Sequence, residues 1–104
     1  MREKTVNALI EMGMPAGIKG FNYIVDIMCL FKEEEYRKCK TTALYEKVGK
    51  MNNTTASGVE RAIRHAFGIV LSKGDLKAVE KYLTTQHPTN GNLLHVLYLK
   101  LVQE

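Results

Sequence analysis

A short segment near the middle of the chain carries the residues best suited to chemistry. From Thr54 to His65 it reads TTASGVERAIRH, which brings hydroxyl, carboxylate, guanidinium and imidazole groups into one stretch. Guanidinium groups pair bidentately with guanine, a carboxylate accepts a hydrogen bond from cytosine, and hydroxyl groups bind phosphate oxygens. The segment therefore holds the groups needed to read DNA. The alternative is an ordinary solvated surface.

A single helix would place these groups on one face. Apolar residues recur at helical spacing from Thr55 to Leu71 and form one stripe: Val59, Ala62, Ile63, Ala66, Phe67 and Val70. The opposite face then carries small and polar residues: Ser57, Arg61, Arg64 and Gly68, with Gly58 and His65 nearby and Glu60 on the flank. Thr54 or Thr55 supplies the N-cap oxygen. The segment is predicted to be the longest helix of the chain.

The residues before this helix predict a second helix that packs against it. From about Thr42 to Met51, Leu44, Tyr45 and Val48 would face inward, and the small Gly49 permits a close crossing. The sequence NNTT makes a tight connection between the two helices. Residues 42–71 thus have the layout of a helix-turn-helix, whose second helix enters the major groove of DNA.

The rest of the chain predicts further helices that support this pair. They run from Glu3 to Met12, from Phe21 to about Phe31, from Asp75 to about Leu83, and onward from Pro88. The charged segment KEEEYRKCKTT is predicted to be a connector with room for a helical turn. No stretch shows sustained period-two alternation. We expect an all-α fold, a compact bundle of about six helices that forms a single DNA-binding domain over residues 1–104.

The positive charge of the chain lies in the same region as the predicted helix pair. The formal net charge is +4, and residues 47–81 carry seven Lys or Arg against three Asp or Glu. Charges outside this segment cancel. A local positive field favours polyanions, most simply the phosphates of nucleic acid.

The sequence offers little for catalysis or for metal binding. Glu33, Glu34 and Glu35 are adjacent like charges in a connector, and the three histidines have no Cys or acidic partner at ligand spacing. Motifs for a nucleophile elbow or for phosphate-binding loops are absent. We therefore expect no enzyme, no metal, no cofactor and no small-molecule substrate.

The two cysteines and the hydropathy indicate the compartment. Cys29 and Cys39 lie too far apart for a CxxC signature, so Cys29 is predicted to be a core residue and Cys39 a free thiol. The N-terminus lacks the apolar region of a signal peptide, and no run reaches the length of a membrane span. The expected location is the cytoplasm.

Three segments, in order, give the chain a family resemblance. The sequence TTASGVERAIRHAFGIVLSKGD resembles the recognition helix of the C-terminal DNA-binding domain of the sporulation master response regulator of Bacilli and Clostridia. MGMPAGIKGFNYI and HPTNGNLL are similar to an early and a late motif of that domain. The resemblance spans nearly the whole chain. It implies a six-helix bundle with a helix-turn-helix, in a two-component transcription regulator that binds short DNA boxes.

The resemblance also implies roles for individual residues. Glu60, Arg61 and Arg64 match positions that face the major groove, and Ser57, Thr54 and Thr55 match the phosphate-facing start of the helix. We predict further phosphate contacts from Lys50 and His65. Gly58 departs from the family, because it stands where the family usually has a base-reading arginine. Loss of one bidentate pair costs about 1–3 kcal/mol of discrimination between bases.

Two other departures and the family's partners complete the expectations. Met51-Asn52 replaces a basic-then-aromatic pair, and the connection TTQH is shorter than usual in a region that the family uses near RNA polymerase. The resemblance implies double-stranded DNA as a partner, with RNA polymerase contact and a homodimer on DNA as further expectations. A second hypothesis is a non-enzymatic interaction module that modulates a full-length sporulation-type response regulator.

Overall fold

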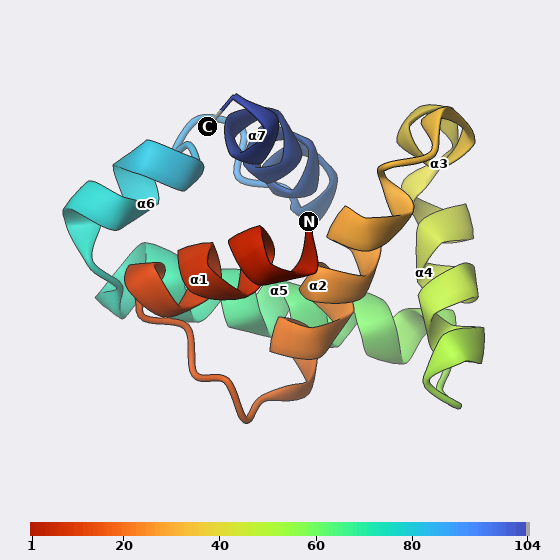
Figure 1. The fold of residues 1–104 in the computed structure, drawn as a ribbon. Helices are drawn as coiled ribbons and strands as arrows, with labels where there is room; N and C mark the ends of the chain where they lie inside the picture. The colour runs from red at the N-terminus through yellow and green to blue at the C-terminus, as the bar shows by residue number, and fades with distance from the viewer. Residues whose placement is uncertain (104) are drawn as a thin grey trace.

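The computed structural model describes residues 1–103, and this part of the chain is entirely helical outside its turns and loops (Figure 1). The elements in chain order are α1 (Arg2–Met12), α2 (Lys19–Leu30), α3 (Glu34–Lys38), α4 (Thr41–Met51), α5 (Ala56–Lys73), α6 (Leu76–Tyr82) and α7 (Asn90–Val102). The predicted all-α fold is confirmed, and the predicted helix ends agree with the observed ones to within about two residues.

The described residues contain seven helices, one more than the expected six, because the charged connector folds into α3. This five-residue helix has Glu34 and Glu35 in its first turn and Arg37 and Lys38 in its last turn. Such placement matches the helix dipole. The Lys38 ammonium also lies 2.7 Å from the Glu34 carboxylate, one turn earlier. The charges that suggested a solvated connector thus stabilise a short, exposed helix.

One hydrophobic core joins the other six helices, and Tyr36 of α3 packs against its edge. Its largest fully buried side chains include Phe31, Phe67, Leu9, Ile24 and Leu94. The predicted stripe of α5 is buried at Val59, Ile63, Ala66, Phe67 and Val70, while Ala62 is half-buried. The prediction that Cys29 is a core residue is wrong, because its side chain is half-buried at the edge of the core. Cys39 is a free thiol, as predicted.

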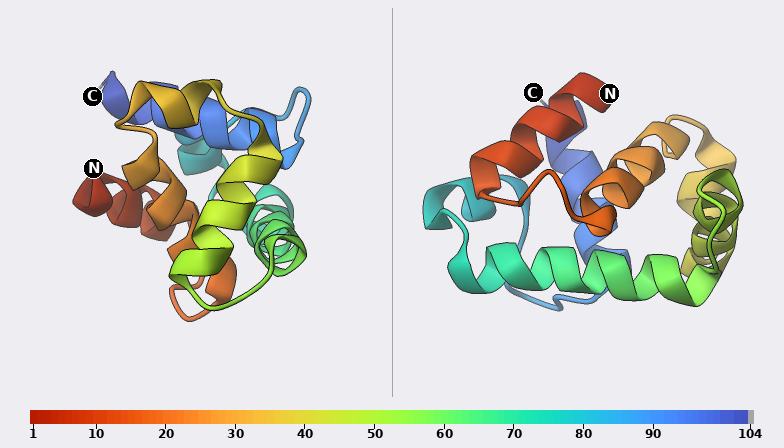
Figure 2. Two further views of the ribbon diagram at one scale, coloured as in Figure 1. Left: turned by 90° about the vertical axis from the view of Figure 1, so that its right-hand side faces the viewer. Right: turned by 90° about the horizontal axis from the view of Figure 1, so that it is seen from below.

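The longest helix, α5, runs along one side of the bundle, and α2 crosses it at very close range (Figures 1 and 2). A Cβ atom added to Gly20 of α2 would lie 2.2 Å from the backbone oxygen of Ala62 and 2.8 Å from the Cβ of Ala66. No side chain fits at position 20 without moving one helix. The crossing therefore depends on backbone-to-backbone approach at this glycine.

The turn between α4 and α5 is tight, as the predicted helix-turn-helix requires, and α4 meets the start of α5 at a steep angle (Figure 1). A Cβ added to Gly49 would lie 2.8 Å from the backbone oxygen of Thr54. Asn53 adopts the left-handed conformation, with φ of 56°, which asparagine tolerates better than most residues. The turn thus folds back closely onto the last turn of α4.

Candidate nucleic-acid interface

The start of α5 is defined by one side-chain cap. Thr55 is the N-cap, and its hydroxyl oxygen accepts a hydrogen bond from the backbone N–H of Gly58 at 3.0 Å. This settles the choice between the two threonines in favour of Thr55. Thr54 and Thr55 are both exposed, and the Thr55 hydroxyl, which accepts from Gly58, keeps its own proton to donate.

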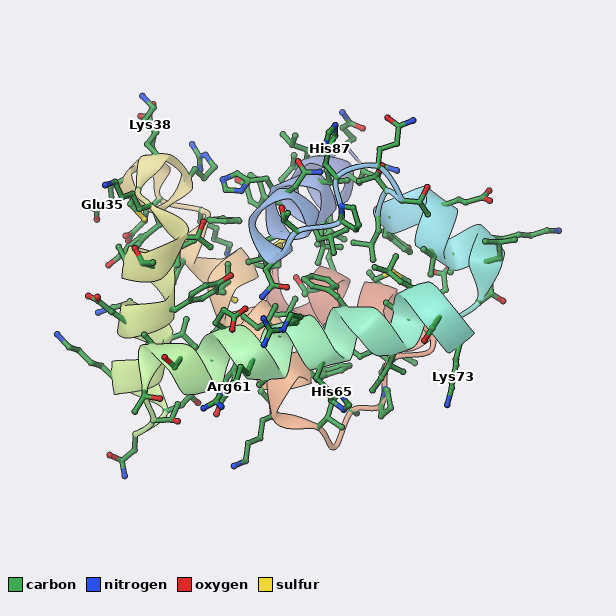
Figure 3. All side chains as sticks on the ribbon, turned by 180° about the vertical axis from the view of Figure 1, so that it is seen from behind. Glu35, Lys38, Arg61, His65, Lys73 and His87 are labelled. Carbon is green, nitrogen blue, oxygen red and sulfur yellow. The ribbon has the colours of Figure 1, made fainter. Side chains whose placement is uncertain are left out.

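The predicted interface residues follow one another along the chain from the last turn of α4, through the turn, to α5. Seven of them are exposed: Lys50, Thr54, Thr55, Ser57, Arg61, Arg64 and His65. Gly58 and Glu60 are half-buried on the flanks of the helix. Arg61, His65 and Lys73 project from the same side of α5, away from α7 and the loop that holds His87 (Figure 3).

Two of the predicted base-reading residues pair with each other. The Arg64 guanidinium lies 3.0 Å from the Glu60 carboxylate, one helical turn earlier, and the two side chains are 65% and 33% exposed. An exposed pair at this spacing contributes about 0.3–0.5 kcal/mol. Arg64 is therefore oriented by Glu60, yet it can leave this partner at little cost.

The departure at Asn52 has a structural explanation. Its side-chain amide donates hydrogen bonds to the Asp26 carboxylate of α2 and to the backbone oxygen of Val48, each at 2.9 Å. Asp26 also lies 3.5 Å from the Arg2 guanidinium. Asn52 thus ties the turn before α5 to α2, a contact between segments far apart in the sequence.

The structure adds polar residues that the sequence patterns did not single out. Lys19 and Asn22, at the start of α2, line a shallow polar depression together with residues of the turn before α5: Asn52, Asn53 and Thr54, with Tyr23 beside them. No spacing rule relates residue 19 to residue 53. The two segments meet because α2 crosses α5 at Gly20.

Tyr45 of α4 is a second residue whose surroundings only the fold reveals. Its ring is buried, and burial raises the pKa of its hydroxyl above the ordinary value of 10.0. A hydrogen-bond contact with the Asn90 side chain of α7 offsets part of this rise in pKa, and the Glu60 carboxylate adds to it. The phenol of Tyr45 therefore ionises at a higher pH than that of a solvent-exposed tyrosine.

Replacement of Tyr45 by phenylalanine is expected to change how stability depends on pH. Because the pKa of Tyr45 is raised in the folded state, its contribution is complete below about pH 10 and is lost as the pH rises through the folded-state pKa. The free energy of unfolding should thus fall less steeply in Tyr45→Phe than in the unchanged protein between about pH 9.5 and pH 11. Urea unfolding followed by circular dichroism measures both slopes, and equal slopes would contradict the assignment.

Neither a metal-binding cluster nor a membrane-spanning helix is found among residues 1–103. This range contains no group of three or more His, Cys, Asp or Glu side chains arranged to hold a metal ion. None of its helices is both long enough and apolar enough to cross a membrane.

The fold and this region together define a class: an all-helical domain in which a short helix and a tight turn precede a long helix with an exposed basic face. Residues 5–101 match the family described as "Sporulation initiation factor Spo0A C terminal", and the chain belongs to that family. The family is the DNA-binding effector domain of a response regulator in sporulation and is not an enzyme. The chain is accordingly a DNA-binding regulatory domain.

Proposed function

We propose that this domain is a sequence-specific transcription regulator that places α5 in the major groove of double-stranded DNA. Arg61 and Arg64 read base edges there, and Glu60 contributes as a base contact or by orienting Arg64. The observation that supports the proposal best is the exposed outer face of α5, where Ser57, Arg61 and Arg64 lie together directly after a tight turn.

Phosphate contacts would flank this reading face. Lys50 lies in the last turn of α4, Thr54 lies in the turn, and His65 is exposed further along α5. The depression lined by Lys19 and Asn22 extends this polar surface to the start of α2. Such contacts position a protein on the duplex without reading its sequence. A DNA-binding role also agrees with the cytoplasmic location expected from the sequence.

Two measurements test the proposal. Selection from a pool of randomised duplexes identifies the preferred sequence, and fluorescence anisotropy then compares its affinity with that of a scrambled duplex at about 50 and 200 mM salt. We expect tighter binding to the selected duplex and weaker binding to both at the higher salt, since phosphate contacts release counterions. Equal affinities at both salt concentrations would remove sequence-specific reading. No binding at low salt would favour the interaction-module hypothesis.

The same titrations address the partners that the family resemblance implies. Pairing of two copies on DNA predicts a second binding step on a duplex that carries two adjacent preferred sequences. Contact with RNA polymerase predicts that, on a native gel, a slower-migrating complex of this protein, polymerase and that duplex forms when polymerase is added. Absence of either complex would remove the corresponding partner from the proposal.

Restoration of the family arginine at position 58 is expected to sharpen sequence preference. Gly58→Arg should raise discrimination between selected and scrambled duplexes by about tenfold or more, the size of one bidentate base contact. The new Cβ would lie 3.0 Å from the Thr54 hydroxyl and 3.2 Å from the Thr55 hydroxyl. Thr54 is exposed and can rotate away, so the substitution is expected to fold.

The matched control is Gly68→Arg, on the exposed face of the same helix, where a Cβ meets no atom within 4 Å. This change adds the same charge to the face that carries Arg61 and Arg64, but it lies four positions beyond Arg64 and outside the predicted base-reading residues. It should tighten binding to both duplexes without changing their ratio. The same ratio in both variants would show that position 58 does not reach a base.

A further inference from the structure

One side chain at the start of α7 connects both helices of the predicted helix-turn-helix. Asn90 is the first residue of α7, and its amide nitrogen donates a hydrogen bond to the backbone oxygen of Glu60 in α5 at 3.0 Å. The Asn90 side chain also lies close enough to the Tyr45 hydroxyl of α4 to lower the pKa of that hydroxyl. Asn90 thus bridges α4 and α5 from outside the turn that joins them.

The first turn of α7 is itself held firmly in place. Thr89 is the N-cap, and its hydroxyl oxygen accepts from the backbone N–H of Asn92 at 3.3 Å. The Asn92 amide donates to the backbone oxygens of Gln86 and His87 in the preceding loop. At Gly91, an added Cβ would lie 3.2 Å from the Thr41 hydroxyl of α4. The first turn of α7, which carries Asn90, is therefore fixed in position close to α4.

This bridge lies next to the candidate reading face. A small depression between α4 and α5 is lined by Thr42, Tyr45, Ala56, Ser57 and Glu60, so the Tyr45 and Glu60 ends of the bridge border the same depression as exposed Ser57. Glu60, whose backbone Asn90 holds, orients Arg64 through its carboxylate. The bridge is therefore connected to two residues of the reading face.

We propose that Asn90 is a positioning residue for DNA recognition, which fixes the angle between α4 and α5 and thereby aligns the arginines with base edges. This inference rests on the proposed function. It also gives a role to the HPTNGNLL segment, whose residues do not belong to the reading face. In this proposal Asn90 affects DNA recognition through two contacts: its hydrogen bond to the Glu60 backbone and its contact with Tyr45.

A positioning role affects discrimination more than overall affinity. Bidentate pairing with a base tolerates only small displacements of the guanidinium, because both hydrogen bonds depend on the direction of the side chain. Lysine contacts with phosphates tolerate such displacements, since the ammonium acts as a point charge on a flexible stem. A loosened angle between α4 and α5 should thus reduce the preference for the selected duplex and leave the salt dependence unchanged.

The main test compares Asn90→Asp with Asn92→Asp. The carboxylate of Asn90→Asp keeps the size of the side chain and suits the first turn of a helix, but it cannot donate to the Glu60 oxygen. Asn92→Asp makes the same chemical change two residues further along α7, where the lost hydrogen bonds lead to the loop and not to α5. Asn90→Ala removes both contacts without adding a charge.

Anisotropy with selected and scrambled duplexes gives the affinity ratio for each variant, at a temperature where circular dichroism shows all of them folded. We expect the ratio to fall about fivefold or more in Asn90→Asp and Asn90→Ala, the effect of about one hydrogen bond. Asn92→Asp should keep the ratio of the unchanged protein. Equal weakening on both duplexes in the Asn90 variants would assign Asn90 a purely structural role and overturn the inference.

The result also separates this inference from the proposed function. If the unchanged protein binds both duplexes equally, sequence-specific reading fails, and the role of Asn90 fails with it. If the unchanged protein discriminates and both Asn90 variants keep its ratio, the reading function stands and only the role of Asn90 is overturned.

Discussion

Arg61→Ala is expected to reduce the preference of the protein for its selected duplex by about tenfold to a hundredfold, corresponding to about 1–3 kcal/mol for a lost bidentate base contact. Arg61 is exposed and projects away from α7 on the outer side of α5 (Figure 3). Its truncation removes no core contact, so the fold and the thermal stability should be retained. Anisotropy on the selected and scrambled duplexes measures the effect.

Lys50→Ala is the matched control for this prediction. Lys50 is also exposed and carries the same charge, but it lies in the last turn of α4 rather than on the reading face of α5. Its removal should weaken binding to both duplexes by a similar factor and lower the salt dependence by about one counterion. The assignment of Arg61 to the groove would be wrong if its variant behaved like Lys50→Ala.

Gly20→Ala is expected to lower the free energy of unfolding by about 2 kcal/mol or more, because the new methyl group overpacks the crossing of α2 and α5. The added Cβ would stand 2.2 Å from a backbone oxygen, and a backbone atom cannot rotate away as a side chain can. The helices must separate, which also displaces the start of α2 from the turn before α5. Urea unfolding followed by circular dichroism measures the loss.

Gly68→Ala provides the contrast within α5. Gly68 is exposed, and an added Cβ there meets nothing within 4 Å. Alanine has the higher helix propensity, so this variant should be more stable than the unchanged protein by up to about 1 kcal/mol. Similar stability changes in the two variants would show that the close crossing at Gly20 does not limit packing.

The helices themselves were predictable because their signals are local. The stripe from Val59 to Val70 repeats at the helical period, and its members are buried with the exception of half-buried Ala62. The sequence predicted a threonine N-cap at position 54 or 55, and the structure selects Thr55, whose hydroxyl accepts from an N–H group three residues later. Asp75 caps α6 with the same spacing. Such features involve neighbours along the chain and require no knowledge of the fold.

Two predictions, for the connector at residues 32–42 and for Cys29, were incomplete or wrong because the local sequence pattern did not show how these residues pack. The connector at residues 32–42 carries seven charged residues, which are typical of a solvated loop. Five of its residues form α3 because their charges match the helix dipole, and Tyr36 also packs against the core. Cys29 was placed in the core by its apolar neighbours, yet its face of α2 lies at the core's edge.

The contents of the reading face follow from periodicity alone, since residues that repeat about every 100° share one side of a helix. The family resemblance could likewise be recognised in the chain's own motifs. Tertiary packing decided how that face is held: Gly20 lets α2 approach α5, Asn52 ties the turn to Asp26, and Asn90 bridges α4 and α5. These contacts join segments 26 to more than 40 residues apart. No local period encodes them, because only the packing of the assembled helices brings these partners into contact.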